Sequence, residues 1–210
     1  MDDTTPYPAS LEIDYPDRQL NRVTTFFRVF TAIPIAVVLG SLSNSEWSST
    51  VGSHSATYRF GAAGLLFVPV LLMLLFRRKY PGWWFDWNLE LSRFSARVGA
   101  YIALLDDTYP STDEEQSVHL QIDRPDGERL SRWLPLVKWL LAIPHLIVLA
   151  FLSIAAIFVV VFAWFAILFT GRYPRGAFGF VVGVMRWGLR VTCYAILLTT
   201  DQYPPFSLDR

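Results

Sequence analysis

Two pairs of arginines are the residues whose type and spacing most strongly suggest a binding site. Arg93 precedes Arg97 by four positions, and Arg186 precedes Arg190 by four, so each pair lies on one face of a helix. Guanidinium groups bind phosphate and carboxylate oxygens through two parallel hydrogen bonds. The residues that this chemistry nominates for binding an anionic lipid headgroup or a protein partner are Arg93, Arg97, Arg172, Arg175, Arg186 and Arg190.

The same arginines have an alternative role that needs no ligand. A long aliphatic stem lets arginine cover apolar surface while its charged end stays at the headgroups of a bilayer. Internal pairing is also possible, because Asp107 and Asp201 occupy corresponding positions beyond the two arginine-bearing segments. Anchoring, internal pairing and ligand binding therefore all remain open.

His145 is the one histidine inside a long apolar run, where ionisable groups are rare and often functional. Pro144 before it removes a backbone donor and leaves a carbonyl group unpaired in the preceding turn. A neutral imidazole could satisfy polar groups there, and no carboxylate in the run completes a proton relay. We favour this structural role for His145.

Gly179 and Gly183 stand four positions apart in an apolar stretch. Small residues at this spacing let two helices approach closely. We expect these two glycines to form a helix-packing face.

The motifs of known catalytic and cofactor sites are missing from the sequence. There is no phosphate-binding glycine loop, no His-Glu-x-x-His, no Cys-x-x-Cys and no Gly-x-Ser-x-Gly. The three histidines have no metal-ligand spacing, and Cys193 is the single cysteine. We predict a non-enzyme without metal or cofactor. The zero net charge gives no reason to expect nucleic acid as a partner.

The composition is that of a membrane protein, with 53% apolar and 17% charged residues. Residues 24–42 contain one charge, Arg28, and residues 60–76 contain none. Residues 134–170 contain only Lys138. A helix of about 20 apolar residues crosses a bilayer core of roughly 30 Å, so these runs predict transmembrane helices.

Several short motifs occur twice in the same order. Leu11–Asp17 resembles Leu120–Asp126, and Ala-Ile-Pro stands at both 32–34 and 142–144. The two halves align when the polar residues 43–59 are omitted from the first. This similarity predicts a tandem duplication, with residues 1–110 as the first repeat, 111–119 as an acidic linker and 120–210 as the second.

The second half also resembles a known family. The relevant motifs are Ala142–His145, Trp164–Arg175, Arg186–Arg190 and Asp201–Phe206. Together they resemble a bacterial, chiefly actinobacterial, membrane family called domain of unknown function 4389. The resemblance implies a bacterial cytoplasmic (inner) membrane, and it carries no activity with it.

These patterns predict an all-α integral membrane protein of two tandem repeats, with short strands outside the membrane at residues 11–13 and 120–122. Each repeat would have two transmembrane helices and one amphipathic interfacial helix. The predicted ranges are about 24–42, 60–76 and 83–105 in the first repeat, and 134–152, 153–170 and 176–198 in the second. Four spans place every Lys and Arg except Arg59 on one side, with the N-terminus cytoplasmic. Six spans, with the third segments crossing, are the alternative.

Three functions fit this prediction. The first is a non-catalytic accessory or assembly protein of the inner membrane that associates with other membrane proteins and lipids. The second is a small transporter or channel with a pathway at the repeat interface. The third is a lipid-binding or lipid-handling protein that works at the arginines.

Overall fold

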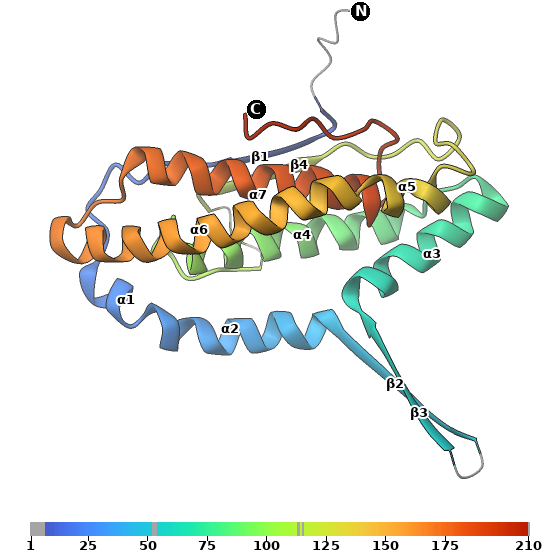
Figure 1. The fold of residues 1–210 in the computed structure, drawn as a ribbon, viewed down its shortest axis with the longest axis horizontal. Helices are drawn as coiled ribbons and strands as arrows, with labels where there is room; N and C mark the ends of the chain where they lie inside the picture. The colour runs from blue at the N-terminus through green and yellow to red at the C-terminus, as the bar shows by residue number, and fades with distance from the viewer. Residues whose placement is uncertain (1–6, 52–53, 113, 115, 210) are drawn as a thin grey trace, which may run out of the picture.

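The computed structural model describes residues 7–51, 54–112, 114 and 116–209. The helices are α1 (Arg22–Phe26), α2 (Arg28–Ser43), α3 (Ala62–Arg77), α4 (Gly82–Ile102), α5 (Pro135–Leu141), α6 (Ile143–Thr170) and α7 (Arg175–Ala195). The strands are β1 (Ala9–Ile13), β2 (Asn44–Val51), β3 (His54–Gly61) and β4 (Val118–Ile122). Figure 1 shows α2, α4, α6 and α7 running roughly along the long axis of the molecule, with the β2–β3 hairpin projecting away from them.

β1 and β4 form a two-stranded antiparallel ribbon in which Leu11 stands opposite Leu120. Both strands alternate buried and exposed residues, as expected where one face of a ribbon packs against a core. The alternation at residues 11–13 and 120–122 predicted strands, and strands are found there. The pairing joins segments that are far apart in the sequence.

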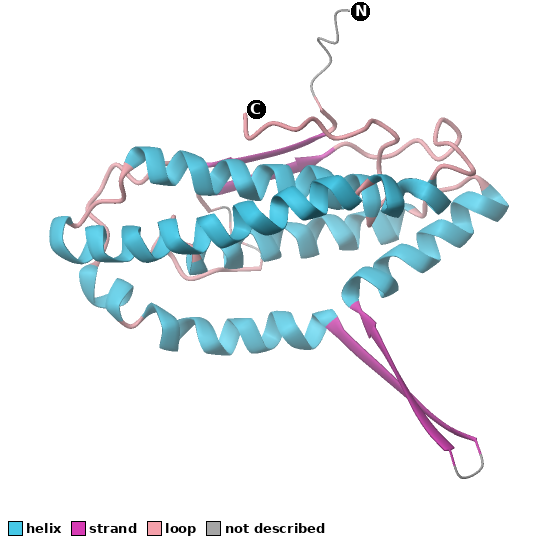
Figure 2. Cartoon of the chain, in the orientation of Figure 1, coloured by secondary structure: helices cyan, strands magenta, loops and turns pink. Residues whose placement is uncertain are grey.

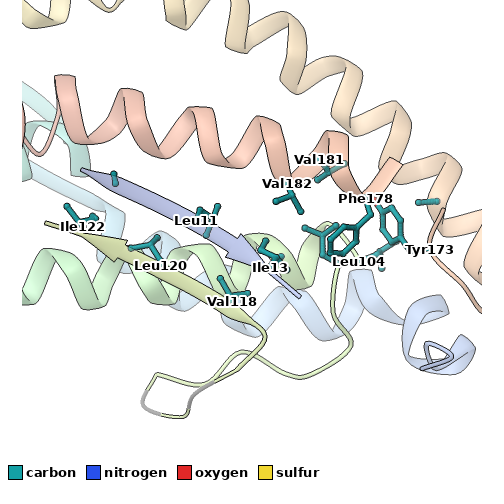
Figure 3. Close-up of a cluster of buried hydrophobic side chains, with 14 of the residues drawn as sticks. Leu11, Ile13, Leu104, Val118, Leu120, Ile122, Tyr173, Phe178, Val181 and Val182 are labelled. Carbon is teal, nitrogen blue, oxygen red and sulfur yellow. The ribbon is translucent and has the colours of Figure 1, made fainter. Parts of the chain in front are cut away.

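α4 and α7 pack against the buried face of the ribbon, one along each strand. β1 lies against α7, and β4 lies against α4. Figure 3 shows Leu11, Leu120 and Val182 pointing into the space between the strands and the helices. The buried cluster there continues to Phe178 of α7 and to Leu104, just beyond α4.

α6 packs on α7 along most of its length. Its inner stripe recurs every three or four residues, as one face of a helix requires. His145 stands near the start of this stripe, and Ala163 and Ile167 stand near its end; all three are buried. Trp187 and Val191 of α7 pack against the first part, and Phe178 packs against the second. Figure 2 shows how much longer α6 is than the helices around it.

The predicted four-span architecture of two tandem repeats is wrong. Among the described residues one helix, α6, is long and apolar enough to cross a membrane. The predicted spans 134–152 and 153–170 are instead a short α5 followed by an α6 that runs through Leu152 and Ser153 without a turn. Neither residue interrupts the helix, because each keeps the backbone donor that a proline would remove.

The first half departs from the prediction as well. α2 and α3 have 16 residues each, which is short for a span. The polar residues 43–59, which the alignment of the two halves omits, contain most of an antiparallel hairpin formed by β2 and β3. The two halves of the chain therefore do not contain the same elements.

The segments predicted as interfacial helices are helical, close to the expected bounds. α4 covers residues 82–102, and α7 covers residues 175–195. Their arginine-bearing faces contact the ribbon, its neighbouring loops and the C-terminal segment, residues 196–209.

Candidate functional site

The arginines at 93 and 186 bind the edges of the ribbon. Arg186 Nε donates to the carbonyl oxygen of Leu11 at 3.0 Å, and Arg93 Nε donates to that of Leu120 at 3.2 Å. These strand carbonyls point away from the partner strand, where they would otherwise lack a hydrogen bond. Unpaired strand edges invite pairing with other chains. Each arginine therefore helps to close one edge of the ribbon.

Arg190 is buried and holds the C-terminal segment. Its Nη2 donates to the carbonyl of Asp209 at 2.6 Å, and its Nη1 donates to that of Ser207 at 3.3 Å. Burial lowers the pKa of Arg190, and the neighbouring charge of Arg186 lowers it further. Arg186 also donates to the carbonyl of Leu208 at 3.1 Å. Backbone carbonyls thus accept hydrogen bonds from both Arg186 and Arg190.

The arginines of α4 have fewer such partners and border a polar cavity. Arg97 Nη1 donates to the carbonyl of Ser111 at 2.9 Å, while its buried Nε has no partner. Arg93 Nη1 pairs with Glu90 at 2.6 Å. The adjoining cavity has a volume of about 400 Å³, and His119 also lines it. Because Glu90 offsets one of the two charges, this cavity is only weakly basic.

Arg172 and Arg175 lie apart from the two pairs, in the connection from α6 to α7 and at the start of α7. Both are exposed. The guanidinium carbon of Arg175 lies 5.1 Å from the centre of the Tyr15 ring, a cation–π distance. The structure therefore does not gather the six candidate arginines into one site.

The two glycines have different surroundings. No atom outside the local helix lies within 4 Å of a Cβ built at Gly179, whereas one at Gly183 would meet Leu208 at 2.9 Å. Gly183 thus gives room to the C-terminal segment, and the close neighbour there is not another helix.

His145 is fully buried where α6, α7 and the C-terminal segment meet. Its Nδ1 accepts a hydrogen bond from Trp187 Nε1 at 3.1 Å. Its ring stacks on Phe206 with centroids 3.9 Å apart, and Tyr203 packs beside it. Its Nε2 has no partner. The aromatic contacts show that His145 fastens the C-terminal segment to α6.

Two buried cations proved more central than their positions in the apolar runs suggested. Lys138 Nζ donates to the carbonyl of Thr200 at 2.6 Å and pairs with Asp201 at 2.7 Å. Burial lowers the pKa of Lys138, and Asp201 opposes that shift. Arg28 donates to the carbonyls of Tyr101 and Asp106 at 3.2 and 2.9 Å. In the sequence, the signal for both residues was that each is the single charge in an apolar run.

An apolar cavity of about 330 Å³ lies between α4 and α7 beneath the ribbon. Leu11 and Leu120 line it from the strands, Ala96 from α4, and Met185 and Leu189 from α7. A second open depression, lined by Asp14, Tyr15, Asp17, Arg175, Phe178 and Gly179, lies near the start of α7. Among the described residues no three His, Cys, Asp or Glu side chains come together as metal ligands.

The outer face of α6 is an apolar surface that the rest of the described chain leaves uncovered. Only 6% of the residues in its most apolar 18-residue window are buried. Phe158 is 71% exposed and Phe169 is 78% exposed. Other large apolar side chains on this face are Leu146, Ile147, Phe151, Ile154, Ile157, Phe162 and Phe165. Such a continuous apolar surface marks an interaction site.

Residues 132–207 match the family described as domain of unknown function (DUF4389). The matched region covers less than half of the chain and contains α5, α6, α7 and most of the C-terminal segment. It includes Lys138, His145, Arg186 and Arg190, so the side chains that fasten the C-terminal segment lie within the matched unit. No curated protein and no solved structure matches the chain.

Proposed function

We propose that the protein is a non-catalytic accessory protein of a bacterial cytoplasmic membrane. The outer face of α6 attaches it to lipid, and the ribbon side associates with other membrane proteins. The observation that carries the proposal is that α6 is long and apolar enough to cross a membrane while remaining almost unburied. A core helix of a water-soluble domain would have this surface covered.

Polar side chains that could bind a ligand instead bind other parts of the same chain, and this supports an accessory role. Arg190, Lys138 and His145 bind carbonyl groups, a carboxylate or aromatic rings of the chain itself. Groups held in this way fix the positions of segments. The transporter alternative required a pathway between two repeats, and the fold does not contain that pair of repeats.

Lipid handling is a second candidate function, favoured by the apolar cavity of about 330 Å³ between α4 and α7. Met185 and Leu189 on one wall and Ala96 on the other give it the lining that an acyl chain needs. In this role the protein would release or exchange lipid and would not hold a protein partner.

Flotation with lipid vesicles tests the attachment. Phe158→Asp combined with Phe162→Asp should reduce the vesicle-bound fraction roughly a hundredfold, because two large side chains lose their burial in lipid and two charges enter it. Gln121→Asp is the matched control, since Gln121 is exposed on the ribbon, and it should float like the wild type. Equal flotation of all three proteins would refute attachment through α6.

Native mass spectrometry from nanodiscs separates the two candidate functions. An accessory protein should be released with a stoichiometric protein partner that is lost when ribbon residues such as Gln121 are replaced by bulky ones. If the protein is instead released as a monomer that carries only lipid, and if Met185→Trp loses that lipid, lipid handling is favoured.

A further inference from the structure

We infer that α6 lies along the membrane surface within one leaflet and does not cross the bilayer. This inference rests on the proposed attachment and adds the orientation of α6. The exposed face of α6 would contact the acyl chains and anionic headgroups of a single leaflet. Three independent features of the structure lead to it.

The first feature is what α6 is fixed to. α6 packs on α7 along most of its length, and α7 packs on β1. Arg186 Nε then holds the carbonyl of Leu11 on the edge of β1. A helix that crossed the bilayer would take α7 and the ribbon into the hydrocarbon with it. Lipid-exposed sheet edges do not occur there, and the ribbon also carries the exposed side chains of Glu12 and His119.

The second feature is the distribution of apolar surface. Phe26 and Phe27 of the α1 region and Phe30 of α2 are about half exposed or more, and α1 contacts α6. In Figure 1 the ribbon lies along one edge of the molecule, while α1 and α2 lie along the other. The apolar surface therefore extends sideways beyond α6 on the side away from the ribbon, as a protein lying in the interface requires.

The third feature is the charge at the two ends of α6. Arg132 precedes α5, and Arg172 follows α6; both are exposed. Arg22 lies beside Gly171 at the second end. The loops beside spanning helices carry an excess of basic residues on the cytoplasmic side. Basic residues at both ends suit a helix whose two ends meet the anionic headgroups of the same leaflet.

The length of α6 agrees with this orientation. Its 28 residues extend about 42 Å at 1.5 Å per residue, whereas the hydrocarbon core is roughly 30 Å thick. Trp133 and Trp139 are exposed just before α6, where indole rings at headgroup level would hold that end at the interface.

Cysteine labelling of the full chain tests the orientation. Arg132→Cys and Arg172→Cys, made singly, are treated with a membrane-impermeant maleimide in intact spheroplasts and in inverted membrane vesicles. Both should react in the same preparation, at least tenfold more than in the other, because both ends of α6 face one side. Reaction of the two positions in opposite preparations would overturn the inference. Wild type is the blank, since Cys193 is fully buried with its pKa raised to about 12.

Depth measurements give a readout that does not depend on the basic ends. Spin labels at Ile147, Phe158 and Phe165, in vesicles of equal parts phosphatidylethanolamine and phosphatidylglycerol, should report one common depth. A profile deepest at the middle position and shallow at both ends would mean that α6 crosses, and would overturn the inference while leaving membrane attachment intact. A chain that fails to float with these vesicles would contradict the attachment itself.

Discussion

Lys138 has no exposed surface, yet its ammonium group is placed where it stabilises two segments at once. It fixes the carbonyl of Thr200 and the carboxylate of Asp201 to the helix before α6. Arg28 does the same for the end of α4 and the residues after it, through the carbonyls of Tyr101 and Asp106. A buried cation is tolerated only when partners replace its hydration. Each of these cations therefore specifies one position for the loop it holds.

Lys138→Met should lower the free energy of unfolding by about 2 to 3 kcal/mol, because Asp201 loses its ion partner in a partly buried site. The loss is smaller than for a fully buried pair, since Asp201 is 28% exposed. Adding Asp201→Asn should recover part of the loss in a double-mutant cycle. Chemical denaturation in mild detergent is the measurement.

The matched control is the exposed pair of Arg129 and Asp126, whose side chains are 89% and 54% exposed. Arg129→Met should change the free energy of unfolding by less than about 0.5 kcal/mol. Equal effects of Arg129→Met and Lys138→Met would mean that burial adds nothing to the Lys138 pair.

At the scale of elements, periodicity identified the parts with a polar face and failed where no polar face exists. The strands at residues 11–13 and 120–122 and the helices near 83–105 and 176–198 could be predicted, because charged or polar residues mark one side of each. Residues 134–170 are apolar on every side, so the pattern contains no sign of where a helix ends. The division at residues 152 and 153 came only from aligning the two halves.

The contacts of the candidate site could not be predicted for a different reason. Arg186 and Arg190 bind backbone carbonyls of Leu11, Ser207, Leu208 and Asp209, and every residue type offers a carbonyl. Side-chain types therefore do not reveal these partners. Only the antiparallel pairing of β1 with β4 places the Leu11 and Leu120 carbonyls at opposite edges of the ribbon.

Ser153→Pro tests the continuity of α6. In the middle of a helix, proline removes one hydrogen bond and clashes with the preceding turn, at a cost of about 3 kcal/mol or more. We expect lower helicity by circular dichroism and a lower melting temperature. Ser153→Ala is the control and should be neutral or slightly stabilising. A melting temperature unchanged by proline would instead indicate a turn at residues 152 and 153.

At the scale of the whole molecule, the halves of the chain depend on each other. The core cluster joins β1 and β4 with α4 and α7 in one set of buried side chains. Tyr80 Oη donates to the carbonyl of Leu197 at 2.8 Å, and Trp164 Nε1 donates to that of Thr25 at 3.0 Å. The region that matches the family, residues 132–207, therefore completes its core with strands that lie outside it.

Dividing the chain in the exposed loop before α5 tests this dependence. A fragment of residues 132–210 lacks β1, so the apolar face of α7 that Leu11 covers would be exposed. We expect the fragment alone to lose cooperative thermal unfolding in detergent and to bind a hydrophobic dye. Co-expression with residues 1–131 should restore a stable one-to-one complex, because those residues supply β1, α4 and β4 together. Leu11→Asp in the fragment of residues 1–131 should weaken that complex strongly. A change at Ser10, which is exposed, is the control and should not weaken it. Cooperative unfolding of the isolated fragment at the melting temperature of the full chain would show instead that the matched region folds on its own.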